Sequence, residues 1–173
     1  MTEDLRLKAL YRYEVLDTLE DQAFDDITRI ASAICNTPIA LISLVDEKRQ
    51  WFKSHLGLNA SETHRDLAFC SRAILGEGIF EITDASRDPR FSENPLVTGE
   101  FGIRFYAGAP LITSDGYALG TVCVLDKVAK SLSSEQKALL ESLSRQVVKL
   151  LELRLNEKVR KEKDRLGKST VLP

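Results

Sequence analysis

The sequence predicts an α+β fold: an α/β sandwich in which one central antiparallel β-sheet is covered on both faces. Three observations predict it. The apolar runs that are typical of strands come in pairs joined by short turns, as in antiparallel sheets. Two amphipathic helices, one near each end of the chain, need a common apolar surface, and one sheet face supplies it. Short capped turns between the strands are left to cover a pocket on the other face.

The composition is that of an ordinary globular protein, with 43% hydrophobic and 29% charged residues among 173. A net charge of −2 argues against a nucleic-acid partner, which would favour a clustered basic surface. No apolar run approaches the roughly 18 residues of a membrane span, and the acidic start lacks the apolar core of a signal peptide. Three cysteines far apart indicate free thiols in a reducing cytoplasm, where we expect the protein.

The first half of the chain predicts two helices and a pair of strands. Residues 4–12 favour a short helix. A second helix, preceded by Thr18 and ended by residues 36–38, has an acidic N-terminal end that its dipole favours. It carries one apolar stripe at spacings of three and four: Phe24, Ile27, Ile30, Ala31 and Ile34. Residues 39–46 and 50–56 then predict two antiparallel strands.

A short cover is predicted in the middle of the chain. A two-turn helix near residues 67–74 ends at Gly76 and Gly78, and residues 80–83 form a short strand. In the segment 84–100, Asp88-Pro89 and Asn94-Pro95 each place a capping side chain before a proline. This pattern predicts two single-turn helices that end at Gly99.

Residues 104–126 predict a hairpin with its turn at Ser114-Asp115-Gly116. Its first strand contains Ala107, Gly108, Ala109 and Pro110, which give up side-chain volume on both faces. Two interpretations remain open: the small residues leave room for a ligand, or they let a helix or the cover approach closely. Because side chains alternate along a strand, these residues fall on two faces of the sheet. The sequence does not show which of the two faces the cavity. Arg104, Tyr106, Gly108 and Pro110 share one face, and Phe105, Ala107, Ala109 and Leu111 share the other.

The C-terminal helix begins with a capping box, Ser133 with Gln136. Its apolar stripe comprises Leu140, Leu143, Val147, Leu150 and Leu151. Beyond Leu155 the chain is mostly charged and predicts a projecting helix, half of a coiled coil or a frayed tail. We therefore expect a helical extension at 1–18, a domain at 19–155 and a charged helical extension or tail at 156–173.

Four segments in the right order resemble a GAF domain, over about residues 5 to 153. They are PIALISLVDEKRQWFKSHLGL, LAFCSRAIL, DASRDPRFSENPLVTGEFGIRFYAGAPL and LGTVCVLD. The resemblance is greatest to the bacterial signalling subgroup found N-terminal to diguanylate cyclase, histidine kinase or PAS modules. It implies terminal helices on one sheet face and a ligand cavity on the other, beneath residues 84–100.

The candidate pocket has polar and apolar residues. The polar candidates are Arg65, Asp84, Asp88, Arg104, Tyr106 and Thr121. The apolar candidates are Phe69, Phe91 and Phe105, and Cys70 lies beside them. These candidates also have purely structural interpretations. Asp84 and Asp88 are typical helix caps, Arg104 could be a solvated residue at a strand end, and Tyr106 could be a core residue.

Enzymatic interpretations find less support. Cys70 lies where free methionine sulfoxide reductases, which share the GAF fold, have a pocket cysteine, but residues 84–104 lack the second cysteine of their covering loop. A thiol-based redox enzyme therefore stays a remote alternative. Bilin attachment is excluded because neither His55 nor His64 follows a cysteine. No metal-ligand spacing, Gly-rich phosphate loop, kinase signature or cyclase signature is present.

The sequence thus predicts a non-catalytic sensory or regulatory module of bacterial signal transduction, and it identifies no cofactor. The expected partners are an unidentified small molecule, a second copy bound through the terminal helices, and a signalling effector. The effector would be a kinase or a cyclic-dinucleotide enzyme, in the same chain or in trans. The alternative is a ligand-free dimerisation or protein-interaction module.

Overall fold

The computed structural model describes residues 2–170 and contains one six-stranded antiparallel sheet in the order β3-β2-β1-β6-β5-β4. Its strands are β1 (Ile39–Val45), β2 (Arg49–Leu56), β3 (Glu62–His64), β4 (Phe80–Ile82), β5 (Phe105–Ile112) and β6 (Ala118–Asp126). The predicted fold class is confirmed. Met1 and residues 171–173, the outer ends of the two predicted extensions, lie outside the described residues.

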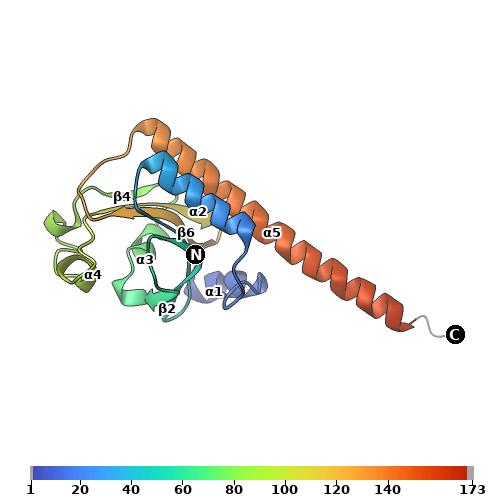
Figure 1. The fold of residues 1–173 in the computed structure, drawn as a ribbon. Coiled ribbons are helices and arrows are strands. Elements are labelled where there is room, and N and C mark those ends of the chain that lie inside the picture. Colours follow the sequence, from blue (N-terminus) through green and yellow to red (C-terminus); the bar gives the residue numbers. More distant parts are fainter. Residues whose placement is uncertain (1, 171–173) are drawn as a thin grey trace.

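Long helices lie on one face of the sheet and short ones on the other. The long helices are α1 (Glu3–Arg12), α2 (Gln22–Cys35) and α5 (Ser134–Thr170). The short ones are α3 (Cys70–Ala73), α4 (Pro95–Thr98) and two 3-10 turns, Arg65–Leu67 and Ala85–Arg87. In Figure 1, α2 and α5 run side by side over the sheet, and the C-terminal part of α5 projects far beyond it.

Several predicted element ends are confirmed by their caps, and others need correction. Ser133 and Gln136 form the capping box, and the amide oxygen of Asn94 caps α4. The second helix starts later than expected because Asp21 accepts from the Ala23 amide and becomes the N-cap. The helix at 67–74 is a single turn. Asp88 forms a turn with Arg90 instead of starting a helix.

The sheet separates two apolar cores. The core beneath the long helices includes Leu10, Phe24, Ala107, Val122 and Leu140. The core beneath α3 and α4 includes Leu41, Phe69, Phe91, Tyr106 and Cys123. Since β1, β5 and β6 are buried on both faces, successive residues of each strand contact different layers.

The small residues of β5 serve close packing. Ala107 and Ala109 belong to the core beneath the long helices, so α5 can approach the strand closely. A Cβ atom added to Gly108 would lie 2.3 Å from the Tyr106 hydroxyl oxygen, because the Tyr106 side chain occupies that space. Ala107 and Ala109 thus favour the close-approach interpretation, whereas at Gly108 the Tyr106 side chain fills the space.

The N-terminal helix is fixed to the sheet by a buried arginine. Arg6 is 1% exposed and donates to the backbone oxygens of Val45 at 2.7 Å and Ala118 at 3.2 Å. Glu3 accepts from the same guanidinium. The hydrogen bond from Arg6, assisted by Arg65, lowers the pKa of Glu3 to about 2, so the carboxylate stays charged. The predicted extension 1–18 thus contributes α1 to the domain's own packing.

Gly120 lies at a close approach between β6 and β1. A Cβ atom at this position would lie 1.8 Å from the Ser43 carbonyl oxygen, a backbone atom that cannot rotate away. We expect Gly120→Ala to lower the free energy of unfolding by about 3 kcal/mol, because the two central strands must separate. Urea denaturation measures this change.

The matched control is Gly76→Ala, since an added Cβ atom there has nothing within 4 Å. This control should change the unfolding free energy by no more than about 1 kcal/mol. Equal effects of the two substitutions would contradict the close approach of β1 and β6.

Candidate functional site

A partly enclosed cavity of about 50 Å³ lies on the sheet face opposite α5. Its floor is formed by the sheet residues Leu41, Gln50, Phe52, Tyr106, Cys123 and Leu125. Its roof comes from the loop after β2, from α3 and from the segment around α4, with Leu58, Ala60, Phe69, Cys70, Leu96 and Ile103. Most of this lining is apolar, so the cavity suits a small molecule with little polar surface.

A cluster of thiols and hydroxyls forms the polar part of the cavity wall. The Cys70 sulfur lies 3.1 Å from the Tyr106 hydroxyl oxygen and 3.1 Å from the Thr121 hydroxyl oxygen. Its distance to the Cys123 sulfur is 3.9 Å. All four side chains are buried in the core beneath α3, and none of them belongs to the core beneath α5.

The surroundings shift the pKa values of the Cys70 and Cys123 thiols in opposite directions. Burial disfavours the Cys70 thiolate, but hydrogen bonds from Cys123, Thr121 and Tyr106 outweigh it and lower the pKa of Cys70 from 9.0 to about 7. Burial and the neighbouring Cys70 raise the pKa of Cys123 well above its ordinary value. Burial likewise raises the pKa of Tyr106, so its phenol keeps the proton it can donate.

Aromatic rings close the cavity on one side. Phe69 lies between two partners, with ring centroids 4.8 Å from Phe91 and 5.2 Å from Tyr106. Phe80 contacts the edges of the same group. Because Phe69 immediately precedes Cys70, this stacking fixes the start of α3 above the thiol cluster.

Gln50 is a polar residue in the cavity wall. Its side chain is 5% exposed, and its amide nitrogen donates to the Thr63 hydroxyl at 3.2 Å. The amide oxygen is buried and has no hydrogen-bond partner within the described part of the chain. An unpaired buried acceptor costs free energy, so this oxygen favours a guest that carries a donor.

The structure brings five of the predicted site residues together. Phe69, Cys70 and Tyr106 line the cavity, and Thr121 and Phe91 contact them from the side. The predicted cover 84–100 contributes only Leu96 to the lining. The rest of the roof comes from the loop that contains Leu58 and Ala60, from Phe69 and Cys70, and from Ile103.

The other predicted residues lie elsewhere. The prediction that Phe105 lines the pocket was wrong. Strand alternation places this residue in the core beneath the long helices, on the opposite sheet face. Asp84 caps a 3-10 turn and Asp88 pairs with Arg90 in a surface turn. Arg104 donates to the Val97 carbonyl, and Arg65 donates to Glu3 and to a backbone oxygen.

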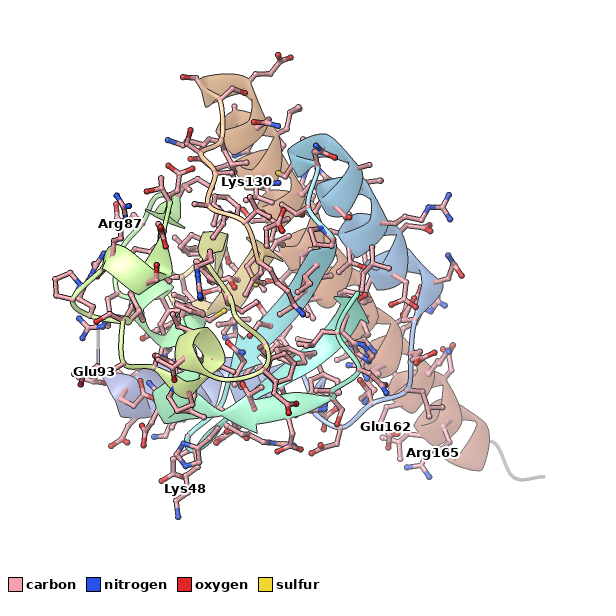
Figure 2. The ribbon with its side chains drawn as sticks, turned by 60° about the vertical axis from the view of Figure 1, so that its left-hand side comes forward. Lys48, Arg87, Glu93, Lys130, Glu162 and Arg165 are labelled. Atoms are coloured by element: carbon pink, nitrogen blue, oxygen red, sulfur yellow. The ribbon has the colours of Figure 1, made fainter. Side chains whose placement is uncertain are left out.

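Charged side chains of the cover point away from the cavity. Figure 2 shows Arg87 and Glu93 at the outer surface of this segment. Arg87 lies 3.8 Å from the Asp84 carboxylate and is 89% exposed. These charges are therefore solvated and do not line the cavity.

Sequence analysis missed the contribution of Gln50, Thr63 and Cys123. The strand β3 has only three residues, Glu62–His64, and no apolar alternation, so nothing indicated that it covers the cavity edge. Cys123 could have been found, because it is two residues after Thr121 and must share its face.

A wider depression of about 630 Å³ lies between α2 and β2, and it is open to solvent. Its polar groups pair with one another. The Lys53 ammonium donates to the Thr18 hydroxyl and the Leu19 carbonyl, and Ser54 donates to Asp25. Among residues 2–170, the unpaired buried side-chain atoms are those of Ser43 and Gln50, and neither residue lines this depression.

Within residues 2–170, no group of three or more His, Cys, Asp or Glu side chains is arranged to hold a metal ion. The same residues contain no helix with both the length and the apolar character that crossing a membrane requires.

Comparisons with known proteins agree with this architecture. Over 135 residues the chain is 47% identical to cyclic di-GMP phosphodiesterase PA2567 of Pseudomonas aeruginosa; the match covers 78% of this chain and 23% of that protein. The chain thus spans less than a quarter of this relative. The GAF domain of Acinetobacter phosphoenolpyruvate-protein phosphotransferase has a similar fold, with a TM-score of 0.64, 20% identity and coverage of 88% and 95%.

The fold is also similar to that of the free methionine-R-sulfoxide reductase of Neisseria meningitidis. That match has a TM-score of 0.58 and 17% identity, and it covers 88% of this chain and 89% of the reductase. The family model of the GAF domain matches residues 20–151, which is most of the chain. The chain therefore belongs to the GAF domain family.

Proposed function

We propose that this GAF domain is a non-catalytic sensory module of bacterial signal transduction that binds a small molecule in the cavity beneath α3 and α4. The observation that carries the proposal is a mostly apolar cavity with Gln50 in its wall, whose buried amide oxygen has no hydrogen-bond partner among residues 2–170. A guest with a hydrogen-bond donor would satisfy this oxygen, and its apolar body would fill the remaining space.

Most ligands can enter the cavity only if its roof moves. Its volume of about 50 Å³ is far below the roughly 300–1,000 Å³ of typical small-molecule sites. The roof consists of loops and the single-turn helices α3 and α4, whereas the floor is a six-stranded sheet. We expect entry to displace the roof and to leave the sheet in place.

Strands β5 and β6 provide a route from the cavity to the long helices. Tyr106 and Cys123 face the cavity, while their neighbours Ala107 and Val122 face the opposite core. A guest that shifts β5 or β6 therefore changes the surface on which α5 packs. Reversing a conformational equilibrium from about 1:99 to 99:1 takes about 5.5 kcal/mol of differential affinity, so the roof must change partners on binding.

The output of this module belongs to an attached or separate effector. The phosphodiesterase relative is a protein of which this chain spans 23%. This relation supports an effector such as a cyclic-dinucleotide enzyme or a kinase, in the same chain or in trans. The three free thiols favour the reducing cytoplasm as its location.

A ligand titration with two matched probes tests this function. Phenol and toluene have similar size, but only phenol carries a donor for the Gln50 oxygen. At about 100 times its Kd, phenol should stabilise the protein by about 2.7 kcal/mol and raise the Tm by about 5–10 °C. Toluene should bind more weakly. Emission from Trp51, which lies in the opposite core, should change on phenol binding.

Two substitutions control this experiment. Ala60→Leu places a larger side chain in the cavity wall and should abolish the rise in Tm, whereas Ala129→Leu, at an exposed position, should retain it. Gln50→Leu should remove the preference for phenol over toluene. A wild-type Tm that neither probe changes would contradict the proposed function.

An interaction module is the second candidate, because the outer helical layer exposes large apolar side chains. Ile30 of α2 is 44% exposed, and Leu139 and Leu153 of α5 are 39% and 57% exposed. Leu139 and Leu153 are 14 residues apart, which places them on the same side of α5. A homodimer that buries this side would bring the two α5 helices together.

Sedimentation of the chain tests this candidate. If the chain dimerises through this layer, Leu139→Glu with Leu153→Glu should convert it to a monomer while the Tm of the domain changes little. Val128→Glu, at a position that is 64% exposed outside the long helices, serves as the matched control. Dimers that persist in the double variant would contradict this interface.

A further inference from the structure

We propose that Cys70 and Cys123 form a redox-responsive dithiol, which a hydroperoxide converts into a disulfide inside the domain. The inference goes beyond the proposed function, because it requires neither a bound ligand nor an effector.

The distance between the two sulfurs is the first support. The Cys70 and Cys123 sulfurs lie 3.9 Å apart, and a disulfide needs about 2.04 Å, so they must approach by about 2 Å. Cys123 is held in β6, which is paired on both sides by β1 and β5. Cys70 begins a single-turn helix between loops. We therefore expect α3 to move toward the sheet.

The surroundings of Cys70 favour its reaction as a thiolate. Tyr106 and Thr121 each place a hydroxyl 3.1 Å from the sulfur, where it can donate to a negative charge. The lowered pKa of Cys70, about 7, agrees with this geometry. Cys123, whose pKa is raised by burial and by Cys70, stays protonated and serves as the second thiol.

The cavity gives a small oxidant access to both sulfurs. Cys70 and Cys123 both line it, although each side chain is almost completely buried from bulk solvent. A volume of about 50 Å³ admits hydrogen peroxide, which is little larger than the water molecule that a site of about 10–15 Å³ can hold. Bulkier oxidants do not fit while the roof is closed.

The reaction balances in two steps. The Cys70 thiolate attacks one peroxide oxygen, the O–O bond breaks, and the products are a Cys70 sulfenic acid and hydroxide, which takes up a proton to become water. The Cys123 thiol then attacks the sulfenic sulfur. The S–S bond forms, and the sulfenic hydroxyl leaves as water with the Cys123 proton. Two thiols and one peroxide thus give one disulfide and two water molecules.

Oxidation would alter the roof of the cavity. A disulfide removes the thiolate to which Tyr106 and Thr121 donate, and it pulls the first residue of α3 toward β6. Phe69, the preceding residue, stacks on Phe91 and Tyr106 and must follow. The dithiol therefore links the oxidation state to the shape of the cavity.

The third cysteine provides an internal control. Cys35 lies in the opposite core beneath the long helices. Burial raises the pKa of Cys35 to about 11, so its thiol remains protonated near neutral pH. We expect hydrogen peroxide to spare it while it consumes the other two.

The test treats the reduced full chain with equimolar hydrogen peroxide near neutral pH and counts thiols after unfolding. The count should fall from three to one, peptide mapping should find a link between Cys70 and Cys123, and dithiothreitol should restore three thiols. A count that stays at three, a link through Cys35 or a link between two chains would overturn the proposal. Because this measurement uses the wild-type protein, it does not depend on whether a variant folds.

Single substitutions assign the roles of the thiols. Cys123→Ser should stop the reaction at a Cys70 sulfenic acid, which dimedone traps, and Cys70→Ser should leave both remaining thiols intact. The matched control Cys35→Ser should still lose both of its thiols. Sulfenic acid at Cys123 in the Cys70→Ser variant would reverse the assignment. Phenol binding is measured on the reduced protein. A failure of the ligand proposal can therefore be told apart from a failure of the dithiol proposal.

Discussion

The neighbouring strands β5 and β6 are buried on both faces, and this double burial governs how the domain packs. Every second side chain must fit beneath α5, and the others must fit beneath α3 and α4. Ala107 and Ala109 meet the first requirement by their small size. Tyr106 and Cys123 meet the second and also form the cavity wall. One pair of strands therefore joins the candidate ligand site to the helix that projects from the domain.

The sequence was sufficient to predict the sheet and the covering helices, because both depend on local signals. Apolar alternation, the capping box at Ser133 and the proline that starts α4 each act within a few residues. The three-residue strand β3 and the buried pairing of Arg6 with β1 and β6 have no such signal. Each becomes visible only when distant segments meet in three dimensions.

The candidate site could be predicted only in part, for the same reason. Residue type indicated Tyr106 and Thr121, and the family resemblance indicated Cys70. The sequence left open which sheet face held the cavity, and Phe105 proved to lie on the opposite face. Gln50 was missed because its role arises from a missing partner, which is a property of the folded environment. The thiol pair depends on a 3.9 Å distance between residues that are 53 positions apart.

We expect occupancy of the cavity to change the packing of α5 through β5 and β6. Amide hydrogen exchange of the full chain, with and without saturating phenol, tests this most directly. We predict slower exchange in the loop after β2, in α3 and also in the part of α5 that covers Ala107 and Ala109. Slower exchange that is confined to the roof, with α5 unchanged, would contradict it.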